Sequence, residues 1–431
     1  MTAPIITSAV NRDEIGRLYR TRLSKGRATL GELFGGHVEV ESEGAWITSQ
    51  EGRRFLNCGG YGVLLMGARH PTVVRYVQEQ LHRHPVASRV LLEPQAALAA
   101  DALVSKAPAG LERVHFACSG AEAVETAIKI ARSTGRDQLI ATHSGYHGKT
   151  MGALSLTGAA KYRDPFHPLL PCVRHVPYGD AESLQAVLET LPGRACFVVE
   201  PVQGEAGVVL PPDGYLRSVQ ELCRAYDACF VLDEIQTGLG RLGSWWGADA
   251  EGLTPDILLS GKALGGGVLP VSAVLARPEA FAAFDKDPYI HTSTFSGLPL
   301  AMAAVRGVLT ALEEDHLVER ARVLGDELLA RLRTIAQHHL GDGIVVEVRG
   351  RGLLIGIEFA IPGPAGDLLI ELISHGVIAN HSLNSSQVLR FTPPAVLSPA
   401  DIQYLCEAFD HSCRALARQY APISGGATRC A

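Results

Sequence analysis

The chain has 431 residues, which at about 150 residues per domain favours two to three domains. Its 39 Lys and Arg residues against 45 Asp and Glu give a net charge of −6, so there is no global positive field to hold a nucleic acid. Hydrophobic residues make up 47% and charged residues 19% of the chain, which excludes a disordered chain and allows a large buried core.

The cysteines and the N-terminal segment bear on location. Nine cysteines include no CxxC pair and their number is odd, so we expect reduced thiols rather than a disulfide framework. The segment MTAPIITSAVNRDEIGR has neither the basic nor the apolar region of a signal peptide. The charge-free stretch 263–276 is 14 residues with four Gly or Pro, too short to cross a bilayer. We therefore expect a soluble, cytoplasmic protein with no membrane partner.

Short apolar runs alternate with helical patterns in the middle of the chain. The parallel-sheet pattern requires continuous apolar strands separated by helices that cover both faces. The sequence thus predicts an α/β fold built on a mostly parallel sheet. The expected strands are 114–118, 138–141, 196–200, 229–233 and 257–260, and the expected helices between them are 122–132 and 215–226.

The pattern changes after about residue 299. Long helical stretches precede shorter strands and a last amphipathic helix, followed by a polar tail after about Tyr420. We expect a large domain over 71–299 and a smaller α/β domain made of 300–431 together with the N-terminal segment 1–70. The expected elements here are helices at 300–314, 316–339 and 399–419 and strands at 352–359, 377–379 and 388–391.

Two glycine-rich motifs are similar to nucleotide-binding loops but lack the required context. Gly238, Gly240 and Gly243 fit GxGxxG, yet residues 234–237 separate them from the preceding strand and no helix pattern follows. In GYHGKT, the first Gly of a phosphate-binding loop is replaced by His143. The histidine pairs of the chain also lack acidic or cysteine partners at metal-ligand spacing. An NAD-dependent oxidoreductase is therefore disfavoured, and no metal site is expected.

Ligands of open parallel sheets bind beyond the carboxyl ends of the strands. Asp233 ends an apolar strand, where a carboxylate serves as a structural ion pair, a helix cap or the partner of a cationic ring nitrogen. Lys262, in LSGKALGGG, follows the next strand in a crowded loop that would lower its pKa and favour a Schiff base. The alternative for Lys262 is an ordinary lysine with its amine in solvent.

Two further segments follow strands. Ser119–Gly120–Ala121 starts a helix, so its backbone N–H groups could bind an anion while Ser119 caps the helix. In SGYHGKT, Tyr146 and His147 lie in a turn flanked by glycines, where a ring could stack on a planar cofactor. An exposed aromatic turn with no ligand is the alternative.

Seven segments, taken together, resemble the class III pyridoxal-phosphate-dependent aminotransferases in order and spacing over about residues 30–420. Further details are most similar to the putrescine (diamine) aminotransferases, with ornithine and acetylornithine aminotransferases next. The segments are CSGAEAVETAIKIAR, SGYHGKTMGALS, EPVQGEAGV, VLDEIQTGLGRLG, LSGKALGGG, TSTFSGLPLA and LRFTPP. The further details are GGYGVLLMGARHP, GYLRSVQELC and HSLNSSQVLRFTPP.

The resemblance implies the fold-type-I architecture of these transferases and pyridoxal 5'-phosphate as the cofactor. Lys262 would form the Schiff base and then shuttle a proton, and Asp233 would pair with the ring nitrogen. Thr294 with Ser293 would reach the cofactor phosphate of the neighbouring subunit, which implies a homodimer with its sites at the subunit interface and leaves a tetramer open. The cofactor-binding residues implied by the resemblance are Ser119, Gly120, Ala121, Tyr146, His147, Glu200, Asp233, Gln236, Lys262, Ser293 and Thr294.

Three residues are implied to contact the substrate. Arg390 would bind the α-carboxylate of glutamate, and Glu205 would pair with this arginine while an ω-amino donor is bound. Tyr61 would line the pocket at a position where the most similar branch tends to have Phe. The sequence also departs from the family's FGGNP, since Ser296 and Leu298 replace a Gly and an Asn.

The implied function is a ping-pong transfer of a terminal amino group. The donor would be a primary amine (a diamine, an ω-amino compound, or in reverse the corresponding aldehyde), and the acceptor an oxo acid such as 2-oxoglutarate or pyruvate. An ornithine or acetylornithine substrate, and the amination of an aldehyde in secondary metabolism, are alternatives. A mutase or a decarboxylase on the same scaffold is a further alternative, because the fold alone does not decide the reaction. A non-catalytic relative should have lost the lysine, and Lys262 is present.

Overall fold

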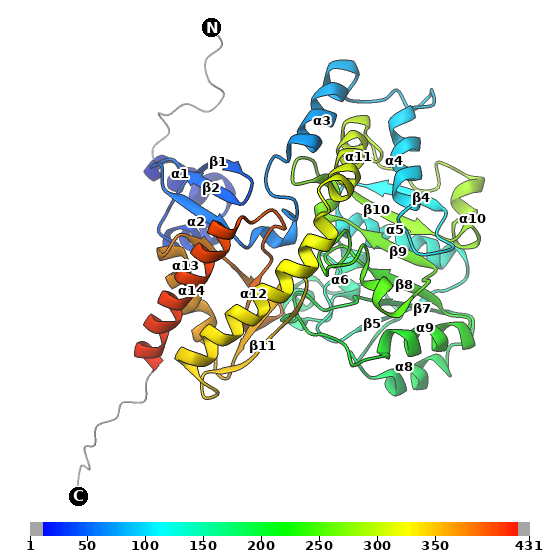
Figure 1. Cartoon of the computed structure of the whole chain (residues 1–431). Helices are drawn as coiled ribbons and strands as arrows, with labels where there is room; N and C mark the ends of the chain where they lie inside the picture. Colours follow the sequence, from blue (N-terminus) through cyan, green and yellow to red (C-terminus); the bar gives the residue numbers. More distant parts are fainter. Residues whose placement is uncertain (1–11, 421–431) are drawn as a thin grey trace, which may run out of the picture.

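The computed structural model describes residues 12–420, so the predicted polar tail and Cys430 lie outside the described residues. In this part of the chain the strands form three sheets, one of seven strands and two of four (Figure 1). No helix among the described residues is long and apolar enough to cross a membrane. The α/β class expected from the sequence is confirmed.

The seven-stranded sheet is the largest, in the order β4-β10-β9-β8-β7-β5-β6. Its strands from β9 to β6 are parallel, whereas β10 runs antiparallel to both of its neighbours. The five parallel strands therefore place their carboxyl ends along one edge. The strands are β4 (Arg113–Ala117), β5 (Gln138–Thr142), β6 (Val173–Val176), β7 (Ala195–Val199), β8 (Cys229–Asp233), β9 (Ile257–Ser260) and β10 (Ser272–Ala276).

Alternate residues of these strands face opposite layers of helices. In β8, Val231 belongs to a buried cluster with residues of α5, α6 and α10, whereas Leu232 belongs to the cluster that contains residues of α8 and α9. Period-2 alternation with both faces apolar produces the continuous hydrophobic runs seen in the sequence. The covering helices are α5 (Gly120–Ser133), α6 (Met151–Leu156), α8 (Ala181–Leu188), α9 (Tyr215–Ala225) and α10 (Pro278–Lys286).

The two smaller sheets combine distant parts of the chain. The N-terminal strands pair in the order β1-β2-β3, and β13 then adds parallel to β3. The other sheet has the order β11-β12-β15-β14. The strands are β1 (Glu39–Glu43), β2 (Trp46–Ser49), β3 (Arg54–Asn57), β11 (Val345–Arg351), β12 (Leu354–Phe359), β13 (Val377–Ile378), β14 (Asn380–Ser382) and β15 (Ser385–Phe391).

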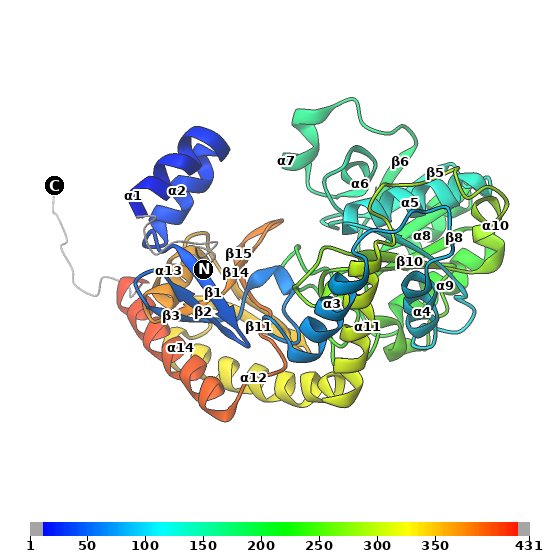
Figure 2. The same cartoon turned by 90° about the horizontal axis from the view of Figure 1, so that it is seen from above.

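The remaining helices cover these sheets or join them to the large one. Figure 2 shows α12 and α14 along one side of the smaller sheets, where they pack against each other. Helix α11 packs instead on α3 and α4, beside the large sheet. The helices are α1 (Arg12–Leu18), α2 (Lys25–Leu33), α3 (Pro71–Arg83), α4 (Pro94–Val104), α7 (Ala160–Arg163), α11 (Pro299–Glu314), α12 (Leu317–Leu340), α13 (Pro364–Ser374) and α14 (Pro399–Tyr420).

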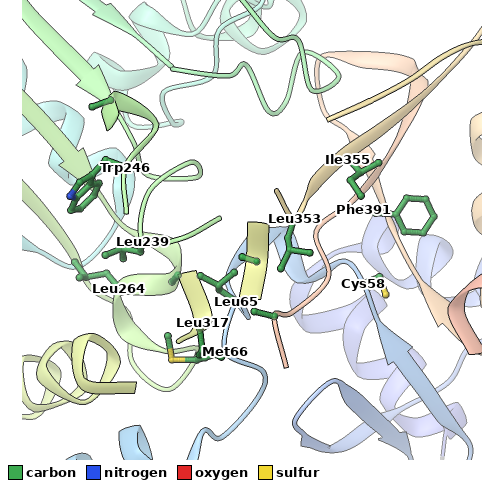
Figure 3. Packing of buried hydrophobic residues seen from close by; sticks show 14 of the residues in the cluster. Cys58, Leu65, Met66, Leu239, Trp246, Leu264, Leu317, Leu353, Ile355 and Phe391 are labelled. Atoms are coloured by element: carbon green, nitrogen blue, oxygen red, sulfur yellow. The ribbon is translucent and has the colours of Figure 1, made fainter. Parts of the chain in front are cut away.

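One buried cluster runs without a break from the large sheet to the smaller ones. In Figure 3, Leu65 and Leu317 lie between Trp246 on one side and Leu353 and Phe391 on the other. All five side chains are at most 4% exposed. Burial of this apolar surface favours one defined arrangement of the sheets, and the loops between them are thereby held in place.

The predicted strands and helices of the middle third are all found, within a few residues of their expected ends. Strands β6 and β10 were not predicted, nor was the antiparallel direction of β10, which a continuous apolar run does not reveal. The strand predicted at 377–379 is short and pairs with β3, more than 300 residues away in sequence. Such long-range pairing leaves no local signal.

Candidate active site

The loops that follow β5, β7, β8 and β9 lie side by side, because these strands are neighbours and parallel. The loop after β5 carries Tyr146 and His147, and Glu200 follows β7 directly. Asp233 is the last residue of β8, and Lys262 lies two residues beyond β9. The strand order therefore brings together residues that are up to 116 positions apart in the sequence.

Asp233 is held in a fixed orientation by two donors. The ring of His147 lies with its Nδ1 2.7 Å from Asp233 Oδ2, and both side chains are at most 4% exposed. The backbone N–H of Ile235 donates to the other oxygen at 3.1 Å. Burial by itself lowers the pKa of His147, but the hydrogen bond to Asp233 and its charge outweigh burial and raise that pKa. The pair thus presents a buried carboxylate in one orientation.

Glu200 fixes the turn that holds Tyr146. Its Oε1 accepts the Tyr146 backbone N–H at 2.9 Å. Burial raises the pKa of Glu200 to about 7, and the nearby charge of Asp233 adds to this effect, although His147 opposes it. Tyr146 itself is half-buried, and burial together with the charge of Glu205 raises the pKa of its phenol. Tyr146 therefore has a set backbone position beside the carboxylates.

Lys262 begins a short 3-10 turn (Lys262–Gly265) in a left-handed conformation, with φ of 44°. Burial lowers the pKa of its amine, and the positive charge of Arg390 acts in the same direction, while Glu205 and Asp233 oppose them. A Cβ placed on Gly62 would lie 3.8 Å from Lys262 Cδ and 3.3 Å from Gln236 Nε2. A lysine in this environment loses its proton more readily than one in solvent.

Arg390 and Glu205 form a buried ion pair beside Gln236. Arg390 Nη2 donates to Glu205 Oε1 at 2.7 Å, and the two side chains are 0% and 4% exposed. Arg390 Nη1 lies 3.5 Å from Gln236 Oε1. A Cβ on Gly204 would fall 1.8 Å from the same Gln236 oxygen, so a larger residue here would displace the Gln236 amide. Glu205 is therefore a buried carboxylate that forms an ion pair with an arginine of β15.

The start of α5 leaves backbone N–H groups available. Ser119 caps the helix, since its Oγ accepts the Glu122 N–H at 3.3 Å. The first-turn N–H groups of a helix have no partner within the helix, so those of Gly120 and Ala121 can bind an anion. A Cβ on Gly120 would lie 3.0 Å from the Ile235 side chain, which explains the small residue at this position.

The other predicted site residues lie outside this group of contacts. Ser293 and Thr294 are in the turn before α11, where Arg89 donates to the Ser293 carbonyl at 2.5 Å and Thr294 is exposed. Tyr61 is 53% exposed and has a φ of 53°, next to Gly62. Their expected roles in binding stay predictions.

Two buried charged residues were not predicted as functional. Arg241 donates to the carbonyls of Leu353 (3.0 Å), Pro393 (2.7 Å) and Gly62 (3.3 Å), so it ties the turn at Gly62 to the segments next to β12 and β15. Glu234 accepts the backbone N–H groups of Gly247 and Ala248 at 2.9 and 2.8 Å. In the sequence, both appear only as charged residues in a glycine-rich loop. Such residues are normally exposed to solvent, so their burial could not be predicted.

The GxGxxG pattern has a packing explanation. A Cβ on Gly238 would lie 2.7 Å from the Trp246 ring, and one on Gly243 would lie 2.8 Å from Arg322. Both glycines therefore allow close contact between the loop and its neighbours, without any need for a dinucleotide.

Comparison with known proteins gives one consistent result. A family model described as aminotransferase class-III matches residues 35–413. The ornithine aminotransferase of Toxoplasma gondii superposes with a TM-score of 0.86 at 30% identity, over 95% of this chain and 96% of that chain. A thermostable (S)-enantioselective omega-transaminase of Thermomicrobium roseum gives 0.87 at 27% identity, over 95% and 99%. A second structure of the Toxoplasma enzyme is described with partial occupancy of pyridoxal phosphate at its active site.

The raised pKa of Glu200 makes the stability of the fold depend on pH. Its carboxyl binds a proton more tightly in the folded chain, where its pKa is about 7, than at its ordinary value of 4.5. Because the folded pKa is raised, the folded state is not penalised below about pH 4.5 and loses stability as the pH rises through about 7.

Glu200→Gln should reduce this loss, because the amide does not ionise and still offers an oxygen to the Tyr146 N–H. We expect the fall in free energy of unfolding between about pH 5 and pH 8 to shrink by roughly 2–3 kcal/mol, measured by urea denaturation. The control is Glu79→Gln, which changes an exposed carboxylate. An unchanged pH dependence in Glu200→Gln would contradict the assignment.

Proposed function

The chain belongs to the class-III aminotransferases, and from this premise we propose that it transfers a terminal amino group between a primary amine and an oxo acid. The observation that carries this proposal is the buried Glu205–Arg390 pair, which lies within electrostatic range of the Lys262 amine. Such a pair gives one pocket two states, one with the arginine neutralised and one with it available to a carboxylate.

Class-III aminotransferases use pyridoxal 5'-phosphate, and the residues of this chain fit that group. The amide nitrogen of Gln236 is buried and has no partner among the described residues, so a ring oxygen would satisfy it. The N-terminus of α5 suits a phosphate, and the oriented Asp233 suits a protonated ring nitrogen. When bound, the cofactor supplies an electron sink that makes a proton on the amine-bearing carbon removable.

We assign the remaining steps to side chains of this chain. Lys262 Nζ would hold the cofactor and later move the substrate proton, for which its lowered pKa is suited because a neutral amine is both nucleophile and base. Asp233, oriented by His147, would keep the ring nitrogen protonated. Tyr146 would cover one face of the ring from the turn that Glu200 fixes.

Arg390 and Glu205 would sort the two substrates. A guanidinium binds a carboxylate with two parallel hydrogen bonds, so Arg390 suits 2-oxoglutarate or pyruvate once Glu205 has left it. With Glu205 in place, the charge of Arg390 is neutralised and an amine without a carboxylate can enter. This supports a diamine or ω-amino donor. An ornithine-type amino acid is the second candidate donor, because the chain is 30% identical to an ornithine aminotransferase.

We also propose a homodimer, supported by an exposed apolar surface near the predicted subunit interface. The loop between α3 and α4 exposes Val90 (88%), Leu91 (76%) and Leu92 (103%). Arg89 in the same loop donates to the Ser293 and Ser296 carbonyls, beside the 56% exposed Phe295. A surface with so many exposed large apolar side chains indicates a protein contact.

The domain division and the cytoplasmic location belong to the same proposal. Pairing of β13 with β3 supports placing the N-terminal segment with the C-terminal part. Helix α11 follows residue 299 but packs on α3 and α4 beside the large sheet, so we place this helix with the large domain and the boundary after it. Eight cysteines among residues 12–420 are free thiols, which supports a reducing compartment.

The first test concerns Lys262. Protein supplied with pyridoxal phosphate should turn yellow, and borohydride should fix the cofactor to the peptide that contains Lys262, as read by mass spectrometry. Lys262→Ala should lose this mass shift and reduce turnover by at least about 10²–10⁴-fold. A panel of terminal amines with 2-oxoglutarate and pyruvate, read by glutamate or alanine formation, identifies the donor. Wild-type turnover in Lys262→Ala, or no product from any amine, would refute the proposal.

The second test concerns Arg390. Arg390→Lys keeps a positive charge for Glu205 but loses the fork that matches a carboxylate. We expect KM for 2-oxoglutarate to rise by roughly 10–150-fold, because a charged hydrogen bond contributes about 1.5–3 kcal/mol, with KM for a carboxylate-free diamine nearly unchanged. An equal change in both KM values would make Arg390 a structural residue. Thermal melting checks that the variant is folded.

The third test concerns assembly. Leu92→Glu should weaken the dimer by on the order of 100-fold, since a charge placed in an apolar interface costs several kcal/mol, and light scattering after gel filtration measures the change. The control is Val346→Glu on β11, also at an exposed position (60%). A dimer that persists in Leu92→Glu would place the interface elsewhere.

A further inference from the structure

The turn between β14 and β15 contacts the active site directly. It consists of Leu383 and Asn384, and β15 carries Arg390 farther along the same hairpin. Both turn residues are half-buried. We call this the 383–384 turn.

Glu205 binds the hairpin at both ends. One carboxylate oxygen, Oε1, accepts from Arg390 at 2.7 Å, and the other, Oε2, accepts the Leu383 backbone N–H at 2.9 Å. The Glu205 backbone carbonyl also accepts the Asn384 N–H at 2.9 Å. The position of the carboxylate therefore depends on the turn as well as on the arginine.

The other side of the turn is held by residues of different segments. The Leu383 carbonyl accepts from the Tyr162 hydroxyl at 2.9 Å and from the Lys161 amine, both on α7. The Asn384 side-chain amide donates to the Ser144 carbonyl at 2.7 Å, in the loop that leads to Tyr146. The residue whose N–H binds Glu205 is thus held at its carbonyl by α7, and the next residue is held by the loop that contains Ser144.

We propose that Tyr162 and Lys161, acting through the backbone of Leu383, are specificity-determining positioning residues that hold Glu205 on Arg390. The proposal rests on the proposed function, in which Arg390 receives the carboxylate of the oxo acid. It assigns part of the choice between the two substrates to α7, which does not itself contact Arg390 in the structure.

The physical basis is the cost of moving Glu205. A substrate carboxylate reaches Arg390 only if Glu205 gives up its bonds to Arg390 and to the Leu383 N–H, and an N–H left unpaired in a half-buried place is unfavourable. If the turn is held less firmly, the Leu383 N–H can find another partner when Glu205 leaves, so the free-energy cost of moving Glu205 falls. Loosening the turn should therefore favour ligands with a carboxylate and disfavour an amine without one. A general loss of structure would weaken both.

The test uses Tyr162→Phe in the holoenzyme and removes one hydroxyl. Glutarate, which has no amino or oxo group to react, is titrated by calorimetry, and KM is measured for a carboxylate-free diamine. We expect glutarate to bind about 3–10-fold more tightly and KM for the diamine to rise by a similar factor, equivalent to part of one hydrogen bond. Lys161→Met with Tyr162→Phe should enlarge both effects.

The matched control is Tyr404→Phe, because the Tyr404 hydroxyl also donates to a backbone carbonyl at 2.9 Å, that of His375 on a distant surface. It should change neither value. Hydrogen exchange read by mass spectrometry should also be faster at the Leu383 amide in Tyr162→Phe, and faster still in Glu205→Ala.

Two results would overturn the proposal. One is weaker binding of both glutarate and the diamine in Tyr162→Phe. The other is an unchanged exchange rate at the Leu383 amide together with an unchanged glutarate affinity, and glutarate that binds neither wild type nor variant counts as unchanged. The glutarate titration and the hydrogen-exchange measurement can both be made without turnover. Failure of transamination with every amine would refute the proposed function separately, while the exchange at Leu383 still decides whether α7 holds Glu205 through the turn.

Discussion

The hydrogen bond between His147 and Asp233 is the interaction on which the site depends. A carboxylate at the end of a buried strand is costly unless it is paired, and His147 Nδ1 at 2.7 Å supplies that partner. The pair is possible because β5 and β8 belong to one parallel sheet, so the loops after them meet at one edge. Glu200, which follows β7 between them, fixes the turn that carries His147 and Tyr146. The sheet register thus determines where the charges lie.

A second constraint joins the sheets. Arg390 comes from the C-terminal hairpin, whereas Glu205 and Lys262 come from loops of the large sheet. Apolar packing from Trp246 to Phe391 holds the two parts together, and fully buried Arg241 links the Gly62 turn to two C-terminal segments. The positions of Arg390, Glu205 and Lys262 therefore depend on packing and hydrogen bonds made by other residues.

The electrostatics of the site follow from this packing. Burial favours the neutral forms of both the Lys262 amine and the Glu200 carboxyl, so the pKa of the amine falls and that of the carboxyl rises to about 7. Arg390 and Glu205 lie in direct contact, so each side chain offsets the cost of burying the other. Neighbouring loops thus bring together a readily deprotonated amine, an oriented carboxylate and a buried ion pair, which are the groups that the proposed transfer between two substrates uses.

The sequence by itself determined the α/β class, the strands of the middle third and, through seven ordered motifs, the family. These signals are local, because hydrophobic periodicity and residue type at strand ends need no knowledge of distant segments. Tertiary structure decided that His147 pairs with Asp233, that Glu205 is buried on Arg390, and that Arg241 and Glu234 are buried at all. It also decided the direction of β10 and the pairing of β13 with β3. Each of these depends on contacts between segments far apart in the chain, and no short window of sequence contains both partners.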